Sequence, residues 1–442
     1  MPGPPFTRGS AHRGSEARRR TVAFVGALVV LGFLLRLGFG LGYWVGKPLM
    51  KDEQEYLLLA TRLALAEGFN YPAPPEGEPA PRRFERPPGF AAFLAAVLTL
   101  TRDALLDHPA AGTDRGLPAS SSEVPVSIKV AQSAVGALGI ILIAALARRA
   151  AGPRAAMLAA AGAAVYPPLA WICGYVLSEP LYSTLALSTV FFLQKASDSG
   201  GRRQLWIGLA AGLLAGSSLL TKEAMLFFLP LAALWLIYTR KYALVVVFAI
   251  GVAAITVPWI VRNFAVHGQF VLTASHGGVT LWTGNNPLAI GEGDLAANPE
   301  MGKARVALED SYPGFTNQQL DEIYYREVFA FIRDQPGSWL VLEAKKLFYT
   351  FVPIGPSYRL HSARYYGASL VSYLVLMPFA LAGLWILVRL GEPSRLWALW
   401  LLALSTVIVS LVFFPQERFR IPVMDPAGIV AAGVLAGLRS RS

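Results

Sequence analysis

Long apolar segments follow one another along most of this sequence, separated by short groups of polar and basic residues. A helix needs ~20 apolar residues to cross the ~30 Å hydrocarbon core of a bilayer, and many of these segments approach that length. They are continuous, whereas the strands of a membrane β-barrel alternate in polarity over ~10 residues. The pattern therefore predicts an all-α polytopic membrane protein with about ten transmembrane helices, at residues 22–45, 126–147, 155–175, 177–195, 204–221, 223–238, 242–261, 367–388, 395–414 and 421–438.

Two further apolar segments, residues 89–106 and 338–355, are predicted to be interfacial or re-entrant helices. The charges indicate this, because basic residues concentrate in cytoplasmic loops. With a cytoplasmic N-terminus and neither segment crossing, the main basic groups all fall in the cytoplasm. These groups are Arg148-Arg149-Arg154, Lys195-Arg202-Arg203, Arg240-Lys241, Arg389-Arg395 and Arg439-Arg441. A crossing by only one segment would move the later groups to the other side; twelve spans is the alternative.

The spans divide the chain into four regions. Residues 1–20, rich in Pro, Gly, Ser and Arg, are expected to form a disordered basic cytoplasmic tail. Residues 21–261 form an N-terminal transmembrane module whose first outer loop covers 46–125. Residues 262–337 form a large outer loop, expected to be a small loop-rich cap with helices, and 338–442 form the C-terminal membrane helices. Arg36 interrupts the first span, and a buried arginine there usually marks a pairing or a pathway.

The first outer loop begins with the charged stretch Lys51-Asp52-Glu53-Gln54-Glu55-Tyr56. After it, apolar residues recur with helical spacing at Tyr56, Leu59, Ala60 and Leu63, which predicts an amphipathic helix. That face is expected to lie in the membrane interface, with the acids at the water-side end. Asp52 and Glu55 also match a D-x-x-E capping pair, so capping and chemistry are both open interpretations of these acids.

Composition agrees with the membrane class and removes several functions. Of the 442 residues, 54% are apolar and 15% are charged, against about 25% charged in soluble domains. The net charge of +11 comes from small basic groups between apolar segments, so it indicates membrane topology rather than nucleic-acid binding. A single Cys173 excludes a disulfide framework and a thiolate zinc site. The sequence has no H-E-x-x-H, Walker A or G-x-G-x-x-G motif.

On this topology, acids and cations from distant parts of the chain reach the outer face together. They are Asp52, Glu53, Arg82, Arg83, Arg86, Glu179, Lys222, Glu223, Arg262, Asn263, Arg418 and Arg420. Arginine and lysine suit the phosphate of an anionic lipid-linked substrate, and a carboxylate suits deprotonation of a hydroxyl or amine. Structural pairing is the alternative for each, including a mutual salt bridge between Lys222 and Glu223. A divalent ion held by Asp52 and Glu179 is also open.

These motifs, in this order and on one side, resemble those of the GT-C superfamily of integral-membrane glycosyltransferases. The resemblance is to the branch of protein O-mannosyltransferases and lipid A aminoarabinose transferases, and it covers most of the chain. The matching motifs are the Asp52-Glu53 pair, RPPG at 86–89, YVLSEP at 175–180, TK at 221–222, PWIVRN at 258–263 and RFRIP at 418–422.

The resemblance implies an inverting transfer of a sugar from a polyprenyl-phosphate carrier, on the non-cytoplasmic face of the plasma (inner) membrane. Asp52 would act as base or orient the acceptor, and Glu53 and Glu179 are the other candidate catalytic acids. Arg86 and Lys222 would bind the departing phosphate, and Arg262, Arg418 and Arg420 complete the expected phosphate-binding set. Both termini would then be cytoplasmic. Glu179 departs from the Asp of the aminoarabinose branch, so the acceptor stays open.

Two other functions are compatible with a chain of this composition. A flippase or transporter of lipid-linked glycans would need polar residues through the middle of the bundle, where Arg36 is the one singled out here. A non-catalytic assembly protein would tolerate the loss of Asp52.

Overall fold

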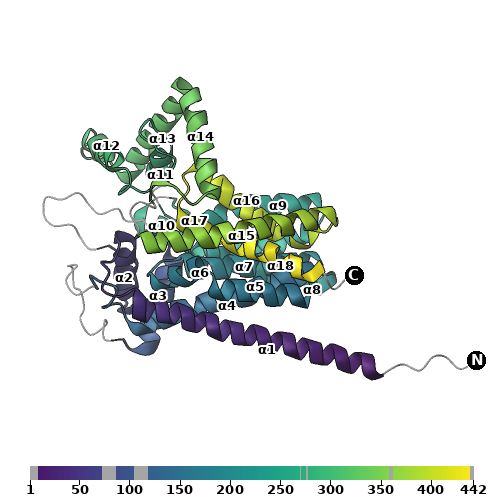
Figure 1. Cartoon of the computed structure of the whole chain (residues 1–442). Coiled ribbons are helices and arrows are strands. Elements are labelled where there is room, and N and C mark those ends of the chain that lie inside the picture. The colour runs from purple at the N-terminus through teal and green to yellow at the C-terminus, as the bar shows by residue number, and fades with distance from the viewer. Residues whose placement is uncertain are drawn as a thin grey trace, which may run out of the picture.

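The computed structural model describes residues 8–71, 86–103, 118–268, 270–274, 277–357 and 362–438. Within these ranges the chain is built from helices, and its only β pairing is an isolated bridge between Pro48 and Ser120. Most helices form one bundle of roughly aligned rods, and a smaller group projects from its side (Figure 1). The predicted all-α membrane fold is confirmed.

Each of the ten predicted spans corresponds to helical structure in the bundle. The helices are α1 (Arg8–Gly38), α4 (Val126–Ala151), α5 (Pro153–Val165), α7 (Glu179–Ser197), α8 (Gly201–Leu219), α9 (Phe228–Tyr238), α10 (Tyr242–His267), α15 (Ala363–Arg389), α16 (Trp397–Val412) and α18 (Met424–Leu438). Among the described residues, five segments are long and apolar enough to cross a membrane: Arg19–Tyr43, Val126–Ala151, Tyr242–Val266, Ala363–Arg389 and Ser394–Val412. The pair formed by α5 and the segment Pro167–Gly174, bent by 62°, brings the number to six if it is one span.

Small residues set the distance between two of these helices. On α8, Gly208, Gly212 and Gly216 recur every four residues along the face that meets α10. A Cβ atom on Gly212 would lie 2.2 Å from the carbonyl oxygen of Phe248 on α10, so only glycine permits this approach. Close backbone contact replaces hydrophobic exclusion as the main packing force between helices in lipid.

Arg36 on α1 bonds to the last carbonyls of α5, where that helix ends inside the bundle. Helix α5 ends at Val165 because Pro167 and Pro168 follow, and prolines have no backbone N–H. The carbonyls of Ala163 and Ala164 would bond to those two N–H groups in a continued helix. The Arg36 guanidinium bonds to them instead, with Nη2 3.0 Å from Ala163 O and Nη1 3.4 Å from Ala164 O. The fully buried arginine therefore has a structural pairing, one of the two interpretations that its place in the sequence suggests.

The first outer loop packs as a helical layer at one end of the bundle. It contains α2 (Lys51–Ala64) and α3 (Pro88–Thr101), which lie against each other. The predicted apolar face of α2 is largely buried in protein: Tyr56 meets Phe90 of α3 edge-on at 4.8 Å, and Leu59 and Ala60 are fully buried. The expectation that this face lies in the membrane interface is therefore wrong, because α3 covers it.

The two short apolar segments do not form full-length spans. Helix α3 has 14 residues and α14 (Pro336–Phe351) has 16, below the ~20 that a crossing requires. Helix α14 belongs to the projecting group, which also contains α11 (Gly277–Gly284), α12 (Pro299–Asp310) and α13 (Asn317–Asp334) (Figure 1). We call these four helices the cap. The predicted boundary at 337/338 thus falls at the start of α14 rather than at the end of the cap.

The N-terminal tail is shorter than the composition predicts. Helix α1 begins at Arg8 and continues without a break into the first span, whereas the prediction places disorder up to residue 20. Alanine, arginine and glutamate dominate residues 16–20, and these residues extend an existing helix at low cost because the span supplies its nucleus.

Helix α1 begins, and helix α18 ends, at the end of the bundle opposite to α2 and α3 (Figure 1). Basic loops meet at that same end. Arg149 forms an ion pair with Asp198 and donates to the carbonyl of Arg395, and Lys241 bonds to Ser197. The bundle therefore has one end rich in basic loops and another end that carries the first outer loop.

Replacing Arg36 by Met should destabilise the bundle, because it leaves the carbonyls of Ala163 and Ala164 without donors. An unsatisfied buried acceptor costs about 1–3 kcal/mol. We expect a lower unfolding temperature in detergent for R36M than for the lipid-facing control L35M. Adding Pro167→Ala and Pro168→Ala restores two backbone N–H groups and should recover part of the loss. Equal stability of R36M and L35M would contradict this explanation.

Candidate active site

The carboxylate of Asp52 is the centre of the polar cluster at the outer-loop end of the bundle. Asp52 lies in the first turn of α2, and each of its oxygens accepts a hydrogen bond from a guanidinium. Arg86 Nη2 donates to Oδ1 at 2.5 Å, and Arg418 Nη1 donates to Oδ2 at 2.6 Å. Arg86 precedes α3, and Arg418 lies on the short helix α17 (Glu417–Arg420). Three distant segments of the chain thus meet at one carboxylate.

Local sequence fixes the direction of Arg86. Pro87 is extended and Pro88 begins α3, since proline at the first helical position needs no N–H partner. Arg86 therefore stands at the helix entrance, where its Nε donates to Glu55 Oε2 at 2.7 Å. Its guanidinium also lies over the ring of Tyr56, 5.4 Å from the centroid. The side chain is thus held by two residues of α2 besides Asp52.

A second acid–base pair lies beside the first. Glu179 begins α7, and Lys222 lies in the tight turn after α8. Lys222 Nζ donates to Glu179 Oε1 at 2.8 Å, and the Glu179 side chain is 1% exposed. The ring of Phe419 joins the two pairs, because Lys222 Nζ lies 4.8 Å and the Arg418 guanidinium 5.4 Å from its centroid. The cluster therefore places three cations around three acids, since Glu55 also binds Arg86.

The electrostatics of Asp52 follow from these contacts. Burial disfavours its ionised form, but the charges of Arg418 and Arg86 outweigh burial, and the pKa of Asp52 lies well below its usual value. The same attraction raises the pKa values of Arg86 and Arg418 against the effect of burial. Burial raises the pKa of Tyr56 to about 12. Asp52 and both arginines are therefore charged at neutral pH.

Glu53 has a different environment from Asp52. It is 2% exposed, and both its oxygens accept backbone hydrogen bonds, from Met50 N at 2.9 Å and from Val176 N at 2.8 Å. The first bond caps α2, and the second ties α2 to the segment that leads into Glu179. Glu53 therefore performs the capping that the D-x-x-E pattern suggests for Asp52 and Glu55. These contacts are those of a positioning residue, and the catalytic role of Glu53 stays a prediction.

Two predicted phosphate-binding residues make contacts elsewhere. Arg420 pairs with Asp425 at 3.0 Å and lies 4.1 Å from the ring centroid of Tyr373. Arg262 donates to the carbonyl of Phe69 at 3.0 Å and lies over Trp259. Both side chains brace helices around the cluster.

Lys222, Glu223 and Asn263 each have a partner in the structure. Lys222 pairs with Glu179 rather than with Glu223, which accepts a bond from Thr273. Asn263 is buried and donates to the carbonyl of Val271. Arg82 and Arg83 lie outside the described residues.

The arrangement does not favour a divalent ion between Asp52 and Glu179. No group of three or more His, Cys, Asp or Glu side chains suited to a metal occurs in the described ranges. Both oxygens of Asp52 are bonded to guanidiniums, and Lys222 occupies Glu179 Oε1, so a dication would face three positive charges. Within the described part of the chain, Glu179 Oε2 is buried and has no hydrogen-bond partner, whereas the other three oxygens of these two carboxylates are bonded.

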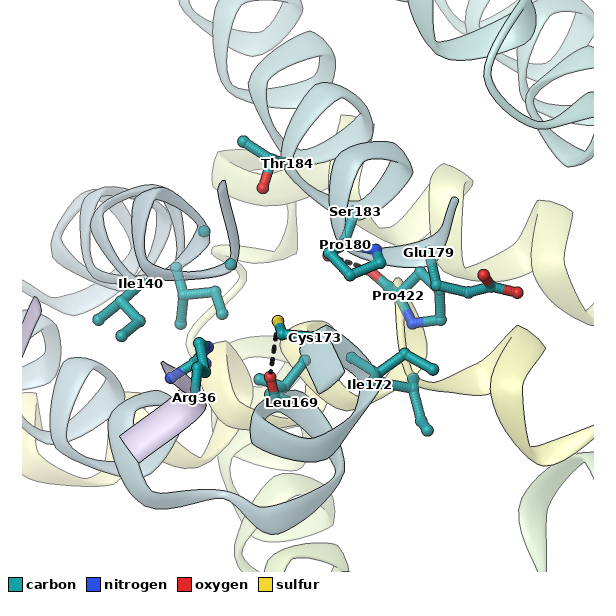
Figure 2. Close-up of a pocket in the computed structure, with 14 residues that line it drawn as sticks. Arg36, Ile140, Leu169, Ile172, Cys173, Glu179, Pro180, Ser183, Thr184 and Pro422 are labelled. Carbon is teal, nitrogen blue, oxygen red and sulfur yellow. Dashed lines mark hydrogen bonds between the residues drawn. The ribbon is translucent and has the colours of Figure 1, made fainter. Parts of the chain in front are cut away.

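A small internal cavity separates this cluster from Arg36. Its lining contains both Glu179 and Arg36, together with apolar side chains such as Ile172. Figure 2 shows the Glu179 carboxylate directed away from Arg36 and Cys173. Arg36 therefore does not take part in the cluster.

Sequence reasoning missed two members of the cluster. Glu55 binds Arg86, although it was not among the residues expected to form the site. Phe419 supports two cations, and its only signal was its place between two arginines in RFRIP. An aromatic residue between two basic residues of a membrane protein is a signal for cation–π support that the residue pattern does contain.

Comparisons with known proteins give a family match over part of the chain and a similar fold. A family model described as dolichyl-phosphate-mannose-protein mannosyltransferase matches residues 121–261, about a third of the chain. No curated protein matches the sequence. Archaeal oligosaccharyltransferase AglB from Archaeoglobus fulgidus, in complex with an inhibitory peptide and a dolichol-phosphate, has a TM-score of 0.56 at 14% identity, covering 96% of this chain and 51% of that one.

Two further solved structures are similar. The Archaeoglobus fulgidus oligosaccharyltransferase tethered with an acceptor peptide has a TM-score of 0.56 at 15% identity, covering 95% of this chain and 50% of that one. ArnT from Cupriavidus metallidurans bound to undecaprenyl phosphate has a TM-score of 0.44 at 17% identity, covering 91% and 77%. The chain spans about half the length of the oligosaccharyltransferases it matches.

The ion pairs of Asp52 should make stability depend on acid pH. Because its folded-state pKa is depressed, the pairs stabilise the fold above the ordinary pKa of about 3.9, and this is lost as pH falls through the folded-state value. In R418M one partner is absent, so the folded-state pKa rises toward the ordinary value, and the acid-dependent loss of stability is smaller and is complete at a higher pH. Unfolding temperatures in detergent from about pH 7 to about pH 3 should show the difference.

The control for this titration is Arg389→Met, which removes a cation over Trp385 far from Asp52 in sequence. R389M should follow the wild-type pH profile. In a D52N background, Arg418→Met should no longer shift the profile. Parallel wild-type and R418M curves would show that the pair does not hold Asp52 ionised.

Glu53→Gln should lower stability, because an amide offers one acceptor oxygen to two backbone N–H groups. The loss of one buried bond is worth about 1–3 kcal/mol. The control is Gln54→Ala on the exposed side of the same turn. Unfolding in detergent measures the difference. If E53Q is as stable as Q54A but inactive, Glu53 is a catalytic residue after all.

Proposed function

We propose that this chain, a member of the GT-C superfamily by fold and by family match, is an integral-membrane glycosyltransferase that uses a polyprenyl-phosphate-linked sugar. The observation that carries the proposal is the cluster of Arg86, Arg418 and Lys222 around Asp52 and Glu179. It lies where the outer-loop layer meets the apolar bundle. An anionic headgroup on a lipid tail fits such a boundary, since the tail stays in the bilayer and the phosphate meets the cations.

The similar proteins support the donor class. The oligosaccharyltransferase AglB is in complex with a dolichol-phosphate, and the family model is described by a dolichyl-phosphate-mannose donor. Both carriers are polyprenyl phosphates. We extend this donor class to the present chain because Arg86, Arg418 and Lys222 meet at one end of the bundle and have the chemistry that binds phosphate.

The three cations suit a leaving group whose charge grows during reaction. The phosphodiester of a sugar carrier has one negative charge, and the departing polyprenyl phosphate gains a second. Guanidiniums and an ammonium that face this phosphate bind the transition state more strongly than the ground state, which accelerates the chemical step. Arg418 and Lys222 share the support of Phe419, so both are held in place before the donor arrives.

In the transfer step, an acceptor oxygen or nitrogen attacks the anomeric carbon as its bond to the phosphate oxygen breaks. The electron pair of that bond leaves with the polyprenyl phosphate, and the acceptor proton passes to a carboxylate. Attack opposite the phosphate inverts the anomeric centre. Asp52 takes the proton in this scheme.

The arginines must first release Asp52 for it to act as base. Paired with Arg86 and Arg418, its pKa is too low for effective proton transfer. A donor phosphate that draws the two guanidiniums toward itself raises the basicity of Asp52 at the moment when the acceptor binds. Glu179 Oε2, the free buried oxygen, lies in the same cluster and can orient the acceptor.

The positive-inside rule gives the orientation. The end with the termini and the basic loops is cytoplasmic, so the Asp52 cluster faces the non-cytoplasmic side. Arg36, the charge within the first span that the sequence analysis singled out for a transporter, is paired with the carbonyls of α5. An enzyme at the rim is therefore favoured over a path through the bundle.

Asp52→Asn should abolish sugar transfer while the protein stays folded and still binds the carrier. Removing a general base typically costs about 10²–10⁴-fold in rate. The readout is mass spectrometry of glycans and glycolipids from cells that lack the gene and are complemented with wild type, D52N or the exposed-carboxylate control Asp310→Asn. D310N should restore the wild-type pattern, and D52N should not.

Two outcomes would decide against the enzyme. If cells lacking the gene show no glycan change, a transferase has no support. If D52N complements fully, Asp52 is not the base. A transporter would instead lose flux of lipid-linked glycan in an assay that contains no acceptor.

A further inference from the structure

Arg418 reaches the cluster from the end of α16. That helix ends at Val412, and the segment Phe413–Gln416 connects it to α17, which carries Arg418. The last four carbonyls of a helix have no partner within the helix. What holds those carbonyls therefore sets where the connecting segment starts, and hence where Arg418 lies.

Two side chains hold the end of α16, one from α14 of the cap and one from the residue directly after α11. Lys346 Nζ on α14 donates to the carbonyl of Leu411 at 2.9 Å, and Asn285 Nδ2 donates to the carbonyl of Val412 at 2.9 Å. A cation at a helix C-terminus also interacts favourably with the helix dipole. Lys346 further donates to Asn285 Oδ1 at 2.8 Å, so the two side chains act as one unit.

Lys346 is buried, and each of its three ammonium hydrogens has an acceptor. Its side chain is 0% exposed, and burying an ammonium is costly unless all its donors are paired. Glu343 Oε1 at 2.6 Å accepts the third hydrogen bond and balances the charge. The neighbour Lys345 is exposed, so the helix offers a lysine without these contacts for comparison.

The connecting segment continues the contact toward the cluster. Gly284 lies against the carbonyl of Phe413, where an added Cβ would be 1.8 Å from the oxygen, and Gly293 lies against the ring of Phe414. Phe414 in turn stacks on Phe419 with centroids 6.1 Å apart. Phe419 is the ring that supports both Lys222 and Arg418. Packed contacts therefore run without a gap from the cap to the phosphate-binding cations.

We propose that Lys346 is a positioning residue for the donor-phosphate site, acting through the end of α16 on Arg418. The inference rests on the proposed function, because it assumes that Arg418 binds the carrier phosphate. It makes the cap part of the donor site, since a side chain of α14 fixes where a phosphate-binding cation lies. Lys346 itself does not touch the donor.

The test is the affinity of the purified full-length protein for undecaprenyl phosphate in detergent micelles. We expect K346M to weaken binding about tenfold, as R418M does, while K345M leaves it unchanged. The double variant K346M/R418M should bind no more weakly than R418M alone, because Lys346 acts through Arg418. If Lys346 had a purely structural role, K346M would lower the unfolding temperature, and the losses of affinity in K346M and R418M would add in the double variant.

Each outcome has one meaning. If wild type does not bind undecaprenyl phosphate, the proposed function fails. If R418M weakens binding and K346M does not, or if the two losses add, the positioning role alone is overturned. Should K346M fail to fold, Asn285→Ala removes the donor to Val412 and one partner of Lys346, and the same cycle with R418M is measured on it.

Discussion

The carboxylate of Asp52 accepts from Arg86, 34 residues away, and from Arg418, 366 residues away. This one contact joins the first outer loop to the last part of the bundle. Arg86, Arg418 and Lys222 carry three positive charges, and Asp52, Glu55 and Glu179 carry three negative charges in the same cluster. The cluster is thus neutral without substrate, which allows so many charges to lie at the edge of an apolar bundle.

Neutrality has a consequence for binding. A phosphate that enters a balanced cluster adds uncompensated negative charge, so it must take cations away from their carboxylate partners. The exchange releases Asp52 at the time when a base is needed. Carboxylate and phosphate compete for the same guanidiniums. Without donor, the guanidiniums pair with Asp52; with donor, they pair with the phosphate and leave Asp52 free to act as base.

The sequence predicted the helices and singled out five charged residues that meet in the fold, but it did not predict how those residues pair. Apolar runs of span length predict bundle helices because lipid leaves few other solutions. Asp52, Arg86, Glu179, Lys222 and Arg418 stood out because charges at a membrane boundary are rare. Their partners depend on the tertiary fold. Glu53 differs from Asp52 by one position, about 100° around a helix, and so points at backbone N–H groups instead of guanidiniums.

The partners of Arg36 and Lys346 could not be predicted from the sequence either. Each residue is a fully buried cation, and no local pattern reveals that its partners are carbonyls: those freed by Pro167 and Pro168 for Arg36, and those at the end of α16 for Lys346. Where no water is present, a backbone carbonyl that has lost its helical donor needs another donor, and a buried cation can supply it.

Both buried cations occur where helical hydrogen bonding stops. Such sites arise wherever a helix ends or breaks inside the protein, so a proline pair or a helix end in a membrane sequence is a reason to look for a distant buried cation. In this chain, Arg36 binds the carbonyls at the end of the broken helix α5. Lys346 binds a carbonyl at the end of α16, the helix end that leads to the donor-phosphate site proposed here.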